Sequence, residues 1–463
     1  MVIFTPSYVI ATAVTVLLPL VAANYISPQL GLALTIIFFL GSCFGRTVGR
    51  QSQAKWKAAA SLWPSMLPPP LKLERGMLVN RDGLHLRRFT IKAERPKAAC
   101  ILVHGYAQSA HFEFLAANYP GGPHSTWDDS ILQHLADSGI SCYAMDLQGH
   151  GESEGARGLR GFFEKFDDLA VDLLQLHDLV SKETNGELPI FWCGTSMGGA
   201  VCCRAAQMRP MTPAGLVMLA PMVSLAKVAE KSVAGPIKNK HLAPIGGLLA
   251  WLMPTLPLIK KSESVLAQQL DAEFRSDNTN YTGSVRVRVA YHFDRVCRGF
   301  LRPEGTKLAL ERVAAPAMLA LHANADTMTE PAGSSELFLR ASCERKTLVL
   351  ISGPDGQPGA CRTMSNGVLT EGLGMKTACE PGKSGKQCTG ICQSYALKPG
   401  GHAMTALEAL HGLNMWHSIT TEPGCQKVSI AVAEWISEEA ARLGVVDPPK
   451  RPPKSPVRRA SGV

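Results

Sequence analysis

Residues 188–206 read Leu188-Pro-Ile-Phe-Trp-Cys-Gly-Thr-Ser-Met-Gly-Gly-Ala-Val-Cys-Cys-Arg-Ala-Ala206, and this stretch decides the fold. The apolar run 188–193 predicts a buried strand, and 200–206 predicts a helix. Between them lies a G-x-S-x-G turn centred on Ser196. Small residues on either side let the backbone turn sharply, which leaves the serine hydroxyl clear of the sheet. We expect Ser196 to be a nucleophile; a glycine-rich turn with a capping serine is the alternative.

Strands and helices alternate along much of the chain. Apolar runs predict strands at 73–80, 84–91, 98–103, 141–145, 215–220, 317–321 and 346–351, and helical spacing predicts helices at 166–181, 333–339 and 427–442. This alternation favours a mostly parallel sheet with helices on both faces. In such sheets functional residues gather at the carboxyl ends of strands, where His104, Asp146, Ser196 and Asp326 fall.

Charge and cysteine content narrow the partners and the compartment. The net charge of +9 is concentrated after the first hydrophobic stretch and in the tail 443–463. No basic patch is interleaved with aromatic residues, so we expect a membrane surface rather than nucleic acid as the partner. Several of the 13 cysteines lie inside strand-like runs, which predicts buried, reduced thiols and a domain that faces the cytosol.

The first 45 residues predict a membrane anchor. No Asp, Glu, Lys or Arg precedes Arg46, and 8–24 and 30–45 are apolar stretches of nearly spanning length. One span or two fit this pattern; a cleaved signal peptide fits less well because there is no basic n-region. The basic residues in the Pro-rich linker 46–72 would keep the following domain on the cytosolic side, on the endoplasmic reticulum or another endomembrane.

Six motifs follow one another in a recognisable order: Leu102-Val-His-Gly-Tyr106, Met145-Asp-Leu-Gln-Gly-His-Gly-Glu-Ser153, Gly194-Thr-Ser-Met-Gly-Gly199, Leu219-Ala-Pro-Met222, His322-Ala-Asn-Ala-Asp326 and Trp416-His417. Together they resemble the monoglyceride lipase branch of the α/β-hydrolases, particularly its plant and algal forms. The resemblance implies Ser196 as nucleophile, Asp326 as acid and His417 as base. It implies an oxyanion hole made by the amides of Tyr106 and Met197, and no metal or organic cofactor.

The resemblance, the alternation of elements and the composition together give the domain plan. We expect an α/β-hydrolase core at 73–222 and 306–442, and a helical cap at 223–305, where the alternation of strands and helices breaks. The basic, Pro-rich composition of 443–463 predicts a disordered tail. The apolar stretch Leu248–Ile259 within the cap suits a lipid substrate or a bilayer surface.

One departure from the family is an insertion at about 352–409. It is rich in Gly, Thr, Lys and Cys and has little periodicity, which predicts a disordered loop or an intron retained in the coding sequence. The segment brings rival bases, His402 within it and His411 just after it. We favour His417 because Glu422-Pro423 and the helix 427–442 follow it at the family's spacing.

These patterns favour a serine esterase that cleaves monoacylglycerol or a related lipid monoester. A lysophospholipase and a phenolic ester hydrolase are alternatives on the same fold. Acyl transfer to an alcohol is another, because His124 and Asp129 match an H-x4-D acyltransferase pattern. A catalytically inactive scaffold would result if the insertion broke the triad.

Overall fold

The computed structural model describes residues 27, 63, 67–117, 122–234, 237–259, 268–351, 363–365, 368–369, 407, 410, 413, 415–422 and 424–444. The predicted anchor (apart from Ser27), nearly all of the tail, and the rival bases His402 and His411 lie outside these residues. Within the described ranges, no helix is both long and apolar enough to cross a bilayer.

A ten-stranded sheet forms the centre of the fold, in the order β1-β2-β6-β3-β7-β8-β13-β14-β15-β16. Its strands are β1 (Leu73–Val79), β2 (His85–Ile91), β3 (Ala98–Val103), β6 (Ile140–Met145), β7 (Ile190–Thr195), β8 (Gly215–Leu219), β13 (Ala317–Ala323), β14 (Arg345–Ile351), β15 (Thr363–Ser365) and β16 (Val368–Leu369). The six strands from β6 to β14 run parallel, and the pairs outside them are antiparallel. The predicted α/β-hydrolase sheet, mostly parallel, is confirmed.

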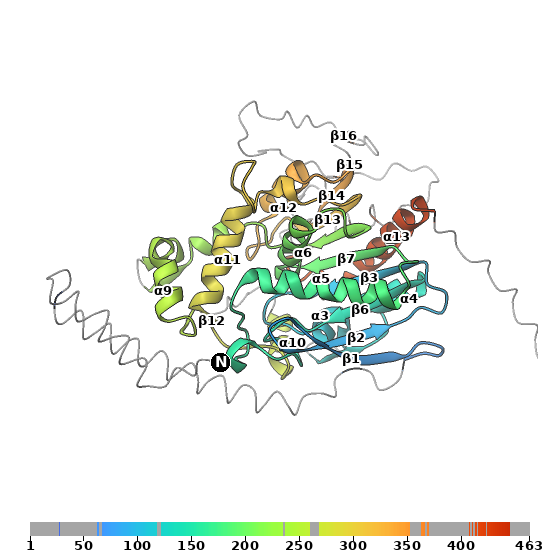
Figure 1. Cartoon of the computed structure of the whole chain (residues 1–463), viewed down its shortest axis with the longest axis horizontal. Coiled ribbons are helices and arrows are strands. Elements are labelled where there is room, and N and C mark those ends of the chain that lie inside the picture. The colour runs from blue at the N-terminus through green and yellow to red at the C-terminus, as the bar shows by residue number, and fades with distance from the viewer. Residues whose placement is uncertain are drawn as a thin grey trace, which may run out of the picture.

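Helices cover both faces of this sheet, as predicted (Figure 1). One face carries α5 (Phe166–Glu183), α6 (Met197–Met208) and α12 (Pro331–Arg340), and the other carries α4 (Ile131–Asp137) and α13 (Cys425–Arg442). Alternate residues of strand β3 point to opposite faces of the sheet. Because helices cover both faces, the strand is buried along its whole length. Ile101 packs under α5 and α6, whereas Cys100 and Leu102 pack under α4 and α13.

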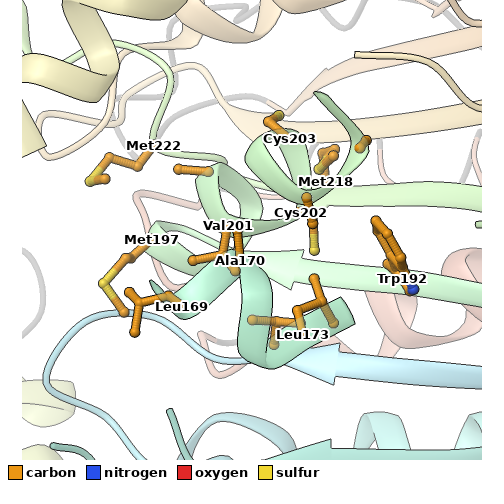
Figure 2. Close-up of a cluster of buried hydrophobic side chains, with 14 of the residues drawn as sticks. Leu169, Ala170, Leu173, Trp192, Met197, Val201, Cys202, Cys203, Met218 and Met222 are labelled. Carbon is orange, nitrogen blue, oxygen red and sulfur yellow. The ribbon is translucent and has the colours of Figure 1, made fainter. Parts of the chain in front are cut away.

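The core beneath α5 and α6 explains why these helices form where they do. Leu169, Leu173, Leu176 and Val180 recur at helical spacing along α5, and all four are buried. Figure 2 shows Leu169 and Leu173 beside α6 and the strand that carries Trp192. Every cysteine that the structure describes is an unpaired thiol, and all but Cys425 are buried, in agreement with the sequence-based expectation.

The chain leaves the sheet between β8 and β13 for the excursion predicted as a cap. It contains α7 (Ala226–Ala229), α8 (Asn239–Leu242), α9 (Gly246–Leu252), α10 (Gln268–Ser276), α11 (Val287–Phe300) and the short strands β9 (Ser232–Ala234), β10 (Ile237–Lys238), β11 (Pro257–Ile259) and β12 (Val285–Arg286). Helix α11 packs on α5 and on α9, and these cap helices stand at one side of the sheet (Figure 1). On α9 and the turn before it, Ile245, Leu248 and Trp251 are exposed.

Five residues of the insertion, which the sequence predicts to be a disordered loop, form two short strands. Strands β15 and β16 extend the sheet from β14, although their sequence has little periodicity. An uncovered β14 would expose a row of unpaired backbone groups, which an added hairpin satisfies. The rest of the insertion lies outside the described residues.

Candidate active site

Ser196 occupies the turn between β7 and α6 in a conformation that few non-glycine residues adopt. Its φ is 51° and its ψ is −115°. The turn is tight, because a Cβ on Gly198 would lie 2.0 Å from Val103 O and one on Gly194 would lie 2.5 Å from Gly198 O. The Ser196 side chain caps no helix amide and is partly exposed. Strain of this kind is concentrated at functional sites, and here it leaves a hydroxyl free for chemistry.

Asp326 and His417 meet in a buried pair. His417 Nδ1–H donates to Asp326 Oδ2 at 2.6 Å, and His322 Nε2 lies 3.1 Å from the same oxygen. Asp326 Oδ1 accepts the backbone N–H groups of Met328 at 2.7 Å and Thr329 at 3.0 Å. Asp326 is fully buried, so these bonds supply the donors that a buried carboxylate requires.

Electrostatics favour an ionised carboxyl and a strongly basic imidazole in this pair. Burial alone would raise the pKa of Asp326, but the charge of His417 and the hydrogen bonds from His322 and His417 hold it well below its usual range. Burial likewise lowers the pKa of His417, yet the carboxylates of Asp326, Glu422 and Glu113 outweigh burial and raise it above its ordinary value. The arrangement favours an ionised Asp326 beside a histidine that readily takes a proton.

The loop after β8 connects Ser196 to this pair. Ser196 N–H donates to Leu219 O at 2.9 Å, and the next residue, Ala220, accepts from Thr329 Oγ1 at 3.1 Å. Thr329 Oγ1 also lies 2.8 Å from Asp326 Oδ2. Among the residues that the structure describes, no hydrogen bond joins Ser196 Oγ to His417.

The loop that carries His417 is organised by Glu422. Glu422 Oε1 accepts the backbone N–H of His417 at 2.8 Å and of Ser418 at 2.7 Å, and Oε2 accepts that of Trp416 at 2.5 Å. Trp416 Nε1–H donates to Thr327 Oγ1 at 3.0 Å, which fastens the loop to the residue after Asp326. These contacts hold His417 locally and use no residue of the insertion.

The proposed oxyanion amides belong to a loop and a helix beside Ser196. Met197 is the first residue of α6, and Tyr106 follows β3. A Cβ on Gly105 would lie 3.4 Å from Ser196 Cβ, so the Tyr106 loop passes next to the serine. Among the described hydrogen bonds, neither the Tyr106 N–H nor the Met197 N–H has an acceptor. The two amides are therefore free to bind a ligand oxygen.

Two other residues at strand ends have structural roles. Asp146 is buried and accepts the N–H of Ala110 and of Glu152, each at 2.7 Å, and burial raises its pKa to about 6. His104 Nε2 accepts the N–H of Leu147 at 2.9 Å, and burial lowers its pKa to about 4. Both side chains are occupied with fixing loops, so their position at strand ends does not make them reactive.

The H-x4-D pattern does not form an acyltransferase site. His124 is the first residue of the short strand β5 (His124–Thr126). Its ring nitrogens lie 2.6 Å from Phe112 O and 3.0 Å from Glu273 Oε2, whereas Asp129 is exposed. His124 thus has no free nitrogen with which to act as a base.

Residues 121–354, just over half of the chain, match the family described as Hydrolase_4: serine aminopeptidase, S33. The chain belongs to this family. Among similar members, the monoglyceride lipase of Rattus norvegicus is 28% identical over 277 residues, covering 60% of this chain and 81% of that protein. The caffeoylshikimate esterase of Arabidopsis thaliana is 28% identical over 262 residues, covering 56% and 70%. The predicted resemblance of this Hydrolase_4 chain to monoglyceride lipases is confirmed.

A solved structure adds a comparison of fold. The monoacylglycerol lipase of Paleococcus ferrophilus is 18% identical, with a TM-score of 0.49, and the match covers 77% of this chain and 99% of that one.

Sequence reasoning missed three residues of this Hydrolase_4 site. Thr329 bridges Ala220 and Asp326, Glu422 holds the histidine loop, and Glu113 lies behind Gly105. In the sequence, Glu422 supports His417 only by its spacing. The signal for its structural role is a carboxyl five residues after the histidine, which can accept the N–H groups of that loop. Glu113 had no signal in the sequence, because its partner Thr420 is 307 residues away.

Proposed function

We propose that the chain is a serine hydrolase that cleaves monoacylglycerol or a related lipid monoester through an acyl-enzyme on Ser196. One observation carries the proposal: a serine on a strained elbow stands at the same sheet edge as a buried Asp326–His417 pair. A serine hydroxyl is a weak nucleophile at neutral pH and needs such a base.

The chemistry follows from the positions of these groups. His417 Nε2 takes the proton of Ser196 Oγ as that oxygen forms a bond to the ester carbonyl carbon. The amides of Tyr106 and Met197 bind the oxyanion, each contributing roughly 10²–10³ in kcat. His417 then returns the proton to the departing glycerol oxygen as the ester bond breaks. Water repeats the sequence on the acyl-enzyme and releases the fatty acid.

The surface of the cap is evidence for a lipid as the substrate. Leu248 and Trp251 lie three residues apart near one face of α9, with 57% and 60% of their surfaces exposed, and Ile245 precedes them. Apolar side chains grouped in this way suit contact with acyl chains or a bilayer surface. We propose that the enzyme works at a membrane, held by the segment 1–45, with its catalytic domain on the cytosolic side of the endoplasmic reticulum or another endomembrane.

The full chain in detergent, with Ser196→Ala beside it, tests the proposal. Wild type should release glycerol and fatty acid from a monoacylglycerol and should be labelled by a fluorophosphonate, and S196A should do neither. Hydrolysis of a lysophospholipid or of a caffeoyl ester in preference to monoacylglycerol would replace the substrate but keep the mechanism. A wild-type chain that is neither labelled nor active would favour the scaffold reading and refute the proposal.

A further inference from the structure

A buried carboxyl outside the proposed triad lies close to the candidate nucleophile. Glu113 belongs to α3 (Ala110–Phe114) and is only 1% exposed. Its Oε1 accepts a hydrogen bond from Thr420 Oγ1, and its Oε2 has no partner. The proposed mechanism does not use this side chain.

Glu113 reaches both loops that the reaction needs. A Cβ on Gly105 would lie 3.4 Å from Ser196 Cβ and 3.7 Å from Glu113 Oε2, so the carboxyl lies against the loop that leads to the Tyr106 amide. On its other side Thr420 follows His417 by three residues, in the loop organised by Glu422. The carboxyl therefore bridges the oxyanion loop and the histidine loop.

Helix α3 is itself held rigidly, so the bridge has a fixed base. Ala110 N–H donates to Asp146 Oδ1 at 2.7 Å, and His111 Nε2 lies 2.7 Å from Asp277 Oδ2. Both partners are buried. A side chain on such a short, anchored helix can fix the position of whatever it binds.

A carboxyl in this place is costly for stability. Burial raises the pKa of Glu113, although the hydrogen bond from Thr420, the charge of His417 and the nearby backbone N–H of Gly105 lower it, and Oε2 receives no hydrogen bond of normal geometry. An apolar side chain of similar size would fill the space without that penalty. The cost is therefore better explained by a contribution to the site than by packing.

We propose that Glu113 is a positioning residue of the reaction, which through Thr420 holds the histidine loop in register with the oxyanion loop at Gly105 and Tyr106. The proposal rests on the serine hydrolase function proposed above. It names a residue that binds no substrate and acts through the placement of His417.

Four variants of the full chain test this role: Glu113→Ala, Glu113→Gln, Thr420→Val and Thr420→Ser. Initial rates on a soluble short-chain ester are divided by the number of sites that a fluorophosphonate labels, which removes any effect of misfolded protein. E113A and T420V should lower kcat by roughly tenfold to hundredfold with KM nearly unchanged, because His417 is displaced. E113Q and T420S, which preserve an oxygen at each end of the bridge, should stay within about threefold of wild type.

Two results would overturn the role of Glu113. One is a wild-type kcat per labelled site in E113A or in T420V; the other is an E113Q enzyme as impaired as E113A. A role in stability alone would lower the melting temperature and the labelled fraction but leave kcat per labelled site unchanged. Failure of the hydrolase function itself looks different, since wild type would then neither label nor hydrolyse.

Discussion

His417 Nδ1 lies 2.6 Å from Asp326 Oδ2, although 91 residues of sequence separate the two. The pair forms because each partner is fixed by its own neighbours: backbone amides hold Asp326, and Glu422 holds the His417 loop. The long insertion between them therefore need not disturb the site.

Replacing Asp326 by Asn should lower kcat about 10⁴-fold, because the amide would present an N–H to Nδ1 and favour the wrong tautomer of His417. Rates on a soluble ester, per labelled site, measure the effect. Asp271→Asn, which removes a surface ion pair with Arg275, is the matched control and should leave kcat unchanged. A D326N enzyme within tenfold of wild type would exclude Asp326 as the acid.

The pH dependence should show a limb set by His417. Only the neutral imidazole can take the serine proton, and the carboxylates of Asp326, Glu422 and Glu113 that face it raise its pKa. Activity should therefore fall as the pH drops, with a midpoint above the ordinary value of 6.5. A pH profile of kcat/KM with a non-ionisable ester measures this midpoint. A midpoint below 6.5 would contradict the assigned electrostatics.

Glu422→Ala should reduce kcat by roughly a hundredfold, since it removes the acceptor for three amides and frees the histidine loop to move. The melting temperature should fall as well, because each bond to a charged acceptor contributes about 1.5–3 kcal/mol. Glu422→Gln keeps one oxygen acceptor, so its kcat and its melting temperature should lie between those of wild type and those of E422A. An E422A variant with normal kcat would show that other contacts position His417.

Two glycine substitutions compare the effect of an added methyl group on stability at the Ser196 turn and on a cap helix. Gly198→Ala would place a methyl group 2.0 Å from Val103 O and 2.8 Å from His104 O. This overlap with backbone should destabilise the chain by about 3 kcal/mol or more. Gly247→Ala on α9 meets only Tyr291, at 3.6 Å, and should be neutral or stabilise by about 0.5–1 kcal/mol. Thermal unfolding compares the two, and equal melting temperatures would contradict the elbow geometry.

The exposed side chains of α9 should affect the rate of hydrolysis of a substrate in a membrane but not that of a soluble ester. The double change Leu248→Ser and Trp251→Ser removes apolar surface, so hydrolysis of monoacylglycerol in phosphatidylcholine vesicles should slow by about tenfold or more. The rate on a soluble ester should not change. Leu339→Ser, at a 53% exposed position on α12, is the control. Equal losses on both substrates would instead indicate a general role of α9 in the fold.

The sheet was predictable because its strands and helices carry clear periodicity. The six apolar residues of β3 and the spaced leucines of α5 predict buried elements within a residue or two of their ends. The positions of Ser196 and Asp326 were predictable for a related reason, since each follows such a strand; their catalytic roles stay predictions.

The parts that escaped prediction depend on contacts between distant segments. Strands β15 and β16 gain their order from the open edge of β14 and not from their own sequence. Thr329 and Glu113 acquire roles only once the loop after β8 and the histidine loop lie beside them. His124 matched a motif locally, yet Glu273 from the cap occupies its ring.

Alanine substitution of His417 and of His402, followed by the rate of monoacylglycerol hydrolysis, tests the central claim most directly. His417→Ala should lower kcat by roughly 10⁴–10⁶, as removal of a triad histidine does, and His402→Ala should retain wild-type activity. An inactive H402A enzyme beside an active H417A enzyme would contradict the account.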